Sequence, residues 1–194
     1  MTASPPDALP RNAANHQPLT PLGFLQWAAA VYPERAALLH GDRSQSWRAT
    51  YARCRQMAAA LTAWGVRRGE VVAVLAPNTP ALYEAHFGVP MAGAVLNALN
   101  TRLDARTLAF ILQHGGATVL LYDSEYAPLV REVLAHLPTP PRTVRIEDSE
   151  YAGPHGDLGD AQYEAWLAAQ PPDAPWEGPR DEWDNLCLHY TSGT

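Results

Sequence analysis

The sequence contains no lysine, and all 14 of its basic residues are arginine. An arginine side chain stays protonated and cannot act as an amine nucleophile. This chain therefore cannot by itself form a Schiff base, place a lysine on a phosphate group or use lysine as a general base. Whatever chemistry the protein performs, a lysine in this chain does not carry it.

Cysteine is scarce as well, with Cys54 and Cys187 far apart in the sequence. Two distant cysteines without an export signal indicate free thiols in a reducing compartment, and we expect both to be packed in the core. Neither Cys-x-x-Cys nor His-Glu-x-x-His occurs, so no metal site is expected. His86, His114 and His136 fall on or at the ends of predicted helices, where packing or solvent exposure is the expected role.

Long hydrophobic runs and basic stripes are also missing. The longest apolar stretch, Phe87–Leu96, is too short to cross a membrane and contains Pro90. With a formal net charge of −6 and scattered arginines, the chain is not expected to bind nucleic acid. The first 18 residues hold four prolines and no apolar core of an export signal. We therefore expect a soluble cytoplasmic protein.

Hydrophobic residues, by contrast, make up 47% of the 194 residues, enough for one domain with a core of its own. Residues 1–18 are polar and Pro-rich and are predicted to form a flexible N-terminal arm. Apolar spacing along the rest predicts helices over 22–32, 50–65, 80–93, 104–115, 124–137 and 160–169. Strands are predicted over 71–75, 94–96, 117–122, 143–146 and 185–190, and a β-hairpin over 37–48 with Gly41-Asp42 in its turn.

This order of elements predicts an α/β fold. Strands alternate with helices over short connections, and Val71–Leu75 is apolar throughout, as in a strand buried on both faces. The pattern is typical of a mainly parallel sheet with helices on both faces. Thr50, Thr79 and Asp104 are predicted to cap the helices that follow them.

The last residues are the most informative for function. A strand runs into Thr191, Ser192, Gly193 and Thr194, whose hydroxyl and backbone N–H groups suit an oxyanion. At the carboxyl end of a parallel strand, such a loop faces the usual ligand crevice. Taken alone, the segment is more typical of an ordinary Ser/Thr turn than of a phosphate site.

Several motifs in a fixed order extend this signal. They are Pro18–Leu25, Tyr51–Arg55, Val72–Thr79, His86–Ala94, Leu99–Leu103, Tyr151–Gly153, Glu182–Asp184 and Tyr190–Thr194. With them, residues 19–194 resemble the AMP-forming acyl-CoA synthetases of the adenylate-forming superfamily, nearest to the fatty-acid and medium-chain branch. The resemblance implies that 19–194 form the N-terminal part of an AMP-binding domain, ending inside its phosphate loop.

The same resemblance implies a two-step reaction with ATP, Mg²⁺ and CoA. A carboxylic acid is first converted to an acyl-adenylate with release of pyrophosphate, and CoA then displaces AMP. In this chain the resemblance assigns only contacts with the ATP phosphates, to Thr191, Ser192, Gly193 and Thr194. The family's catalytic lysine, metal-binding glutamate and acyl pocket lie further along, so this chain holds no catalytic residue and is expected to be inactive alone.

Two other interpretations remain open at this stage. The chain could belong to an adenylating enzyme with a different acceptor, or it could be a non-catalytic α/β module that binds a partner or forms dimers. Apolar surface left exposed on such a piece favours self-association or a homodimer. Ser192 as a hydrolase nucleophile is disfavoured because the Gly-x-Ser-x-Gly pattern is missing.

Overall fold

The computed structural model describes residues 12, 14–156 and 158–191. Its centre is a five-stranded sheet in the order β4-β3-β5-β6-β7, in which every pair of neighbours is parallel. The strands are β3 (Val71–Leu75), β4 (Val95–Ala98), β5 (Ala117–Asp123), β6 (Arg142–Ile146) and β7 (Ala161–Gln162). A separate antiparallel hairpin is formed by β1 (Ala36–His40) and β2 (Arg43–Ser46). The predicted fold class is confirmed.

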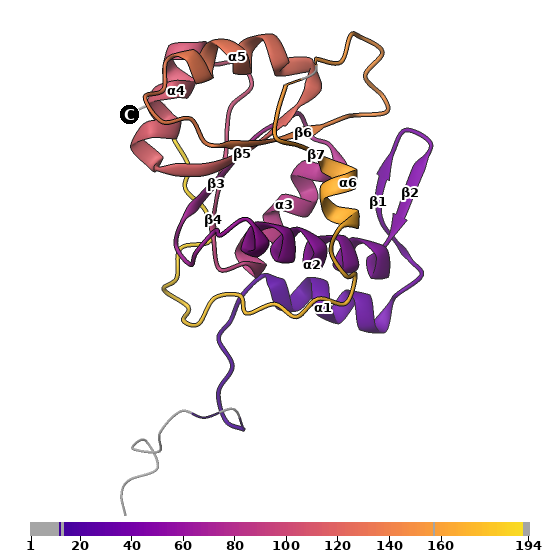
Figure 1. The fold of residues 1–194 in the computed structure, drawn as a ribbon. Coiled ribbons are helices and arrows are strands. Elements are labelled where there is room, and N and C mark those ends of the chain that lie inside the picture. The colour runs from indigo at the N-terminus through magenta and orange to yellow at the C-terminus, as the bar shows by residue number, and fades with distance from the viewer. Residues whose placement is uncertain (1–11, 13, 157, 192–194) are drawn as a thin grey trace, which may run out of the picture.

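Helices cover both faces of this sheet (Figure 1). The helices are α1 (Leu22–Val31), α2 (Trp47–Ala63), α3 (Pro80–Met91), α4 (Ala105–Gly115), α5 (Ala127–Ala135) and α6 (Tyr163–Ala168). One core contains residues of α2, α3 and α6, and another contains residues of α4 and α5. The strand β3 contributes alternate residues to each, with Val72 and Val74 in the first core and Ala73 and Leu75 in the second. This alternation explains why β3 is apolar throughout.

The start of α2 differs from the prediction. The helix begins at Trp47, and the hydroxyl of Ser46 caps it by accepting a hydrogen bond from Ala49 N at 3.2 Å. Thr50 lies inside the first turn, where its hydroxyl donates to Ser46 O and accepts from Gln45 Nε2. The prediction that Thr50 caps this helix is therefore wrong. A threonine one turn into a helix can donate its hydroxyl hydrogen to the carbonyl oxygen four residues earlier, so it can lie inside the helix as well as at its N-cap.

The other two predicted caps had different outcomes. The Asp104 carboxylate accepts from Thr107 N at 3.0 Å, as expected for an N-cap. Thr79 occupies the N-cap position of α3 with an extended backbone, but its hydroxyl makes no capping hydrogen bond. Pro80, at the first position of α3, has no N–H to donate, which leaves Thr79 with fewer donors to cap.

Two predicted helices begin later than the sequence pattern suggested. Over 124–137, residues Ser124–Tyr126 form a 3₁₀ turn, and α5 follows only from Ala127. Over 160–169, Ala161–Gln162 instead extend the sheet as β7 beside β6, and α6 begins at Tyr163. A two-residue strand has too few residues to display an alternating pattern, so the sequence did not reveal it.

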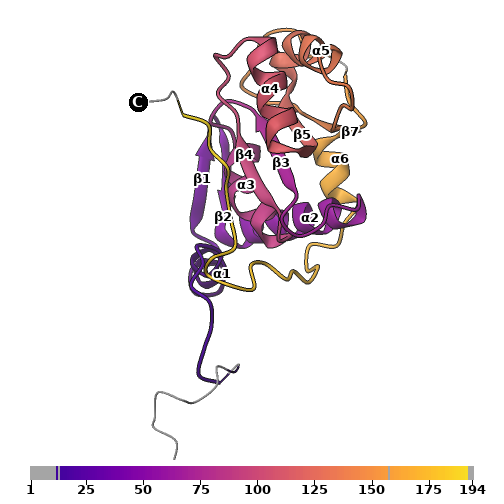
Figure 2. The ribbon, with the colours of Figure 1, turned by 90° about the vertical axis from the view of Figure 1, so that its left-hand side faces the viewer.

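The last predicted strand is reduced to a short parallel contact. Residues 185–190 meet the sheet through one bridge, Leu96 to Cys187. Leu96 N donates to Leu186 O at 3.0 Å, and Leu188 N donates to Leu96 O at 2.8 Å. Figure 2 shows this segment, in yellow, running alongside β4 toward the C-terminal end. Cys187 is exposed there, so the prediction that it is a core thiol is wrong, whereas Cys54 is buried as expected.

A buried carboxylate joins the hairpin to three helices. Glu84 on α3 has no exposed surface, and its oxygens accept hydrogen bonds from Arg53 at 2.6 and 3.2 Å. Tyr163 Oη donates to it at 2.6 Å and Gln45 Nε2 at 2.9 Å. Burial works against the charged form of Arg53, but its hydrogen bonds to Glu164 and Glu84 outweigh this and raise its pKa. The network therefore contains a permanently charged arginine.

We expect Arg53→Met to destabilise the fold strongly. The substitution keeps a long apolar side chain but leaves Glu84 buried without its cation, which costs about 3 kcal/mol or more. Urea unfolding of the chain measures the change in the free energy of unfolding. Arg67→Met is the matched control, because Arg67 pairs with Glu70 while 84% exposed and its loss costs less than about 1 kcal/mol. Equal losses in both variants would contradict the role given to the network.

Candidate active-site edge

The carboxyl ends of the parallel strands meet at one edge of the sheet. At this edge, β5 ends in Asp123 and is followed by Ser124, while β6 is followed by Glu147 and Asp148. Polar side chains from separate strands are thereby placed together, as ligand sites of open α/β sheets require. Within the described part of the chain, this edge is the candidate ligand site.

Asp123 is the most unusual group at the edge. It has no exposed surface, and its Oδ1 accepts from Glu125 N at 3.1 Å, while Oδ2 has no hydrogen-bond partner among the described residues. Burial, with smaller contributions from the nearby charges of Glu125 and Asp148, raises its pKa to about 6. The main cause of this pKa shift is burial of the charged form in the folded edge. The sequence showed an acid directly after a buried strand, but we did not single it out.

Two histidines tie surface segments to the same edge. Ser124 Oγ and His155 Nδ1 share a hydrogen bond of 2.6 Å, which joins the loop after β6 to the end of β5. His40 Nε2 and Asp148 Oδ1 lie 2.7 Å apart and join the hairpin to the end of β6. Because the Ser124 side chain is buried, the Ser124–His155 pair presents no accessible nucleophile. We read both contacts as fixing loops, and neither as a catalytic pair.

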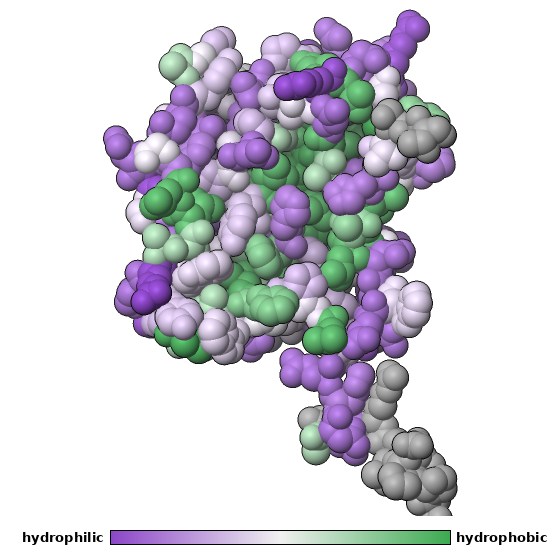
Figure 3. Space-filling view, turned by 180° about the vertical axis from the view of Figure 1, so that it is seen from behind, coloured by the Kyte–Doolittle hydropathy of each residue, from purple (hydrophilic) through white to green (hydrophobic). Residues whose placement is uncertain are grey.

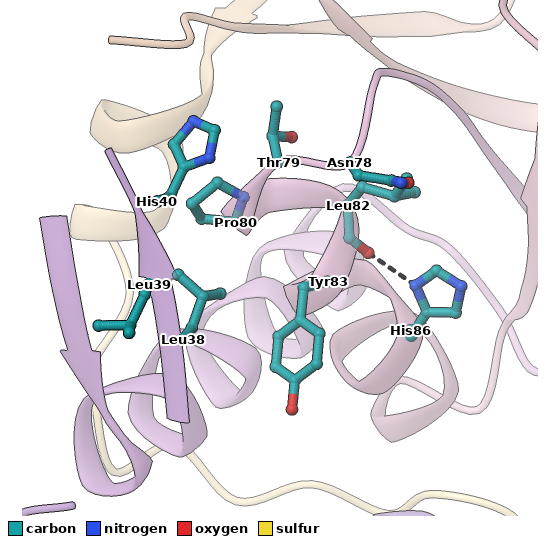
Figure 4. A pocket seen from close by; sticks show the side chains of 9 residues that line it. All are labelled: Leu38, Leu39, His40, Asn78, Thr79, Pro80, Leu82, Tyr83 and His86. Atoms are coloured by element: carbon teal, nitrogen blue, oxygen red, sulfur yellow. Dashed lines mark hydrogen bonds between the residues drawn. The ribbon is translucent and has the colours of Figure 1, made fainter. Parts of the chain in front are cut away.

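A cavity of about 290 Å³ lies between β1 and the start of α3 (Figure 4). Its lining is mainly apolar, from Leu38, Leu39 and Leu82, with Thr79 and two histidines beside it. Figure 4 shows His86 directed at the carbonyl oxygen of Leu82, at 2.8 Å, so this ring is already engaged. No arginine lines the cavity among the described residues. It is therefore poorly suited to phosphate.

The predicted phosphate contacts lie at the end of the described chain. Thr191 is described and exposed, whereas Ser192, Gly193 and Thr194 lie outside the described residues. The residue before them, Tyr190, is half-buried, and its hydroxyl shares a hydrogen bond of 2.7 Å with His114 Nδ1 at the end of α4. The expected role of His114 was packing or solvent exposure, and the sequence gives no signal for this contact because its partner is 76 residues away.

Metal and membrane features were searched in the same part of the chain. Among the described residues, no three His, Cys, Asp or Glu side chains gather in a metal-binding arrangement. Within those residues, too, each helix falls short of the length and apolar character that crossing a bilayer demands.

The whole chain was then compared with known proteins. A family model described as "AMP-binding enzyme" matches residues 25–194. The chain belongs to the AMP-binding enzyme family. The resemblance drawn from the motifs is thus confirmed, and the matched range takes in the Tyr190–Thr194 segment.

Two curated relatives of this chain are named as CoA ligases. The acetate–CoA ligase CCL3 of Humulus lupulus is 46% identical and covers 97% of the chain, and the peroxisomal acetate/butyrate–CoA ligase AAE7 of Arabidopsis thaliana is 44% identical over the same share. In both matches the chain spans only 35% of the relative's own length. The chain thus corresponds to about one third of these ligases.

Solved structures of CoA ligases share the fold. The anthranilate CoA ligase AuaEII, in complex with anthranoyl-AMP, superimposes with a TM-score of 0.77 at 26% identity, covering 89% of this chain and 32% of that one. The N-terminal domain of FACL13 from Mycobacterium tuberculosis gives a TM-score of 0.69 at 27% identity, covering 89% and 41%. The described fold is that of the N-terminal region of adenylate-forming ligases.

We expect Asp123→Asn to stabilise the AMP-binding chain at neutral pH but not at low pH. The pKa of Asp123 is raised from near 4 when unfolded to about 6 when folded, so ionisation costs stability as the pH rises through this window. Relative to the wild type, the variant should gain about 2 kcal/mol between pH 4 and pH 7. Urea unfolding at a series of pH values measures the difference. A pH-independent difference would contradict the raised pKa.

Proposed function

We propose that this chain is the N-terminal third of an AMP-forming acyl-CoA synthetase. The proposal is supported above all by identities of 44–46% with acetate and butyrate CoA ligases across 97% of the chain. It is supported further by the fold shared with a ligase that holds an acyl-adenylate, anthranoyl-AMP. In this proposal, residues 19–194 are the first part of the AMP-binding domain; most of the predicted N-terminal arm, residues 1–11 and 13, lies outside the described residues.

The reaction proceeds in two displacements. A carboxylate oxygen of the acid attacks the α-phosphorus of ATP, the bond to the bridging oxygen breaks, and pyrophosphate leaves. The CoA sulfur then attacks the acyl carbon, the bond to the AMP oxygen breaks, and a thioester forms. Negative charge on the phosphates must be stabilised in the first step, and preorganised N–H and O–H donors do this effectively.

We assign those donors to Thr191, Ser192, Gly193 and Thr194. Hydroxyl and backbone N–H groups in such a loop form a concave site for phosphate oxygens, and glycine permits close approach. Support comes from the residues directly before the loop: Cys187 bridges to the parallel sheet at Leu96, and the Tyr190 hydroxyl contacts His114 at the end of α4. Mg²⁺ enters with ATP, whose phosphates hold it, together with groups beyond the described residues.

For the acid, we propose short-chain carboxylates. The named relatives include ligases for acetate, for butyrate and for 2-methylpropanoate, the last from Humulus lupulus and 41% identical. This shifts the expectation from the fatty-acid and medium-chain branch toward smaller acids. For location we propose the cytoplasm, since free thiols fit a reducing compartment; the peroxisome, which appears in several relatives' names, is the alternative.

The activity test uses the complete polypeptide that carries this chain. With ATP, Mg²⁺, CoA and acetate, butyrate, 2-methylpropanoate or octanoate, we expect pyrophosphate and AMP release and a thioester, fastest with the short acids. The 194-residue chain alone should release no pyrophosphate, because its residues supply phosphate contacts and no catalytic group.

Each other outcome has a distinct meaning. Acid-dependent pyrophosphate release without CoA consumption would favour an adenylating enzyme with another acceptor. No pyrophosphate release by the complete polypeptide with any of the acids would favour a non-catalytic module. Release by the 194-residue chain alone would contradict the assignment of catalysis to the rest of the protein.

Self-association of the isolated chain is the second proposal. The α1 helix carries no charged residue, and Phe24 and Trp27 on it are 76% and 56% exposed. They adjoin a shallow cavity of about 690 Å³ lined by residues 17–30. Figure 3 shows further hydrophobic residues gathered across the face seen from behind. Exposed apolar surface of this extent favours association.

We therefore expect the 194-residue chain to dimerise or form larger species at micromolar concentrations, measured by light scattering over a dilution series. Phe24→Ser with Trp27→Gln should shift it toward monomer by removing apolar contact area. Arg106→Gln on α4 serves as an exposed control outside this patch. A wild-type chain that stays monomeric throughout would contradict the proposal.

A further inference from the structure

Tyr190 is held from the side by α4. Its hydroxyl lies 2.7 Å from His114 Nδ1, and the two rings meet nearly at right angles with centroids 5.8 Å apart. Phe110, one turn earlier on α4, stacks on the His114 ring with centroids 5.4 Å apart. The imidazole therefore contacts two aromatic rings, and its hydrogen bond to the hydroxyl orients the tyrosine.

The next residue of α4, Gly115, lets the C-terminal segment come close. A Cβ atom at this position would lie 3.1 Å from Leu188 Cδ2 and 3.4 Å from Tyr190 Oη. The distance to Leu188 is tighter than ordinary packing and the distance to Tyr190 is at the limit of ordinary contact, so a side chain at 115 requires the Leu188 side chain to shift by a few tenths of an ångström. Asn97 of β4 points to the same place, with its Nδ2 3.6 Å away, and its buried amide has no hydrogen-bond partner among the described residues.

The backbone contacts of this segment are too few to fix its end. Residues 185–190 meet the sheet only through the two hydrogen bonds with Leu96. Upstream, Arg68 holds the segment by pairing with Asp184 at 3.0 Å and donating to Gly178 O at 2.6 Å. Downstream of Leu188, the His114–Tyr190 contact is the side-chain anchor that the described residues provide.

We propose that His114 and Gly115 are positioning residues for the phosphate loop. They fix Tyr190 against α4 and thereby position Thr191, the first residue of the proposed loop. The proposal rests on the function proposed above, in which these residues bind the ATP phosphates. A shift of about 1 Å in a group that orients a reacting phosphate is enough to reduce the rate severely, so a contact outside the loop can govern its action.

Amide exchange in the 194-residue chain tests the anchor without any assumption about activity. In His114→Ala, the amide hydrogens of Leu96 and Leu188, which bond across to the segment, should exchange about fivefold to tenfold faster than in the wild type. The amide hydrogen of Leu99, bonded to Val74 O inside the sheet, should keep its rate. His136→Ala, an exposed histidine at the end of α5, is the matched control and should change none of them.

Rescue and coupling sharpen this test. His114→Asn places an amide atom near the position of Nδ1 and should restore most of the protection. Tyr190→Phe removes only the hydroxyl and should reproduce the effect of His114→Ala, and the double variant should add little, because both remove one hydrogen bond. Gly115→Ala should accelerate exchange through crowding, with His114 unchanged.

Steady-state kinetics of the complete polypeptide test the effect on the loop. His114→Ala and Gly115→Ala should raise the KM for ATP about fivefold to tenfold, with the KM for acid and for CoA within about twofold of wild type. His114→Asn should return the KM for ATP toward wild type. A purely structural contact would change the amount of folded enzyme and leave all three KM values alone.

Two results would overturn the proposal. Unchanged exchange at Leu188 in His114→Ala would show that the contact does not hold the segment. Faster exchange with an unchanged KM for ATP would show that the segment is held but that the loop does not depend on it. A wild-type polypeptide with no adenylation at all would instead refute the proposed function, and with it the role in ATP binding, while the exchange data would still decide whether the anchor exists.

Discussion

A carboxylate with no exposed surface must be paired inside the protein, and Glu84 imposes this requirement on much of the fold. Its partners come from α2, from α6 and from the hairpin, so these elements have to assemble around α3. An unpaired buried charge costs several kcal/mol, more than most single contacts provide. The surroundings of Glu84 also affect two neighbouring groups. Burial, and then the charge of Glu84, raises the pKa of Tyr163 and the pKa of the Cys54 thiol. Both groups stay neutral and serve as packing.

The parallel sheet adds a second constraint, because it aligns the ends of its strands at one edge. The strand β4 lies at the border of the sheet. There the backbone of Leu96 forms hydrogen bonds with residues 186 and 188 of the C-terminal segment. The C-terminal segment can approach α4 because Gly115 has no side chain and because His114 shares a hydrogen bond with the hydroxyl of Tyr190. In our proposal, the position of Thr191 thus depends on contacts of α4, a helix to which we assign no substrate contact.

The sequence predicted the fold well wherever a pattern was long enough to show a period. Val71–Leu75 was placed without error, and Gly116, with a φ of 66°, ends α4 as foreseen. The prediction failed where the deciding contact is distant or the element is short. Thr50 was predicted to cap α2, but its hydroxyl forms hydrogen bonds with Ser46 O and Gln45 Nε2 instead. These contacts cannot be predicted from the sequence. Cys187 was assigned to the core because its apolar neighbours suggested a buried strand, whereas the segment forms only a single bridge at the sheet border.

The sequence indicates the proposed phosphate loop but not the contacts that we propose to support it. Thr191–Thr194 carry their signal in residue type, because hydroxyls and glycine suit phosphate wherever they occur. His114 carries none, since an isolated histidine at a helix end is usually packing or solvated. Its partner is identified only when the chain returns beside α4 after 76 residues. Asp123 is similar: its position after a strand is visible in the sequence, but the burial that raises its pKa to about 6 is a property of the folded edge.

The absence of lysine now has a physical meaning for this part of a ligase. Cationic charge on the phosphates would have to come from arginine here, but the arginines near the returning segment and the core are engaged. Arg53 pairs with Glu84 and Glu164, and Arg68 pairs with Asp184. The donors that we propose for the ATP phosphates, in Thr191–Thr194, are by contrast neutral hydroxyl and backbone N–H groups. Such donors stabilise charge only when they are held in place before the reaction, because they gain nothing from long-range attraction. Precise positioning of the loop by its neighbours then matters more for this chain than any charge it carries.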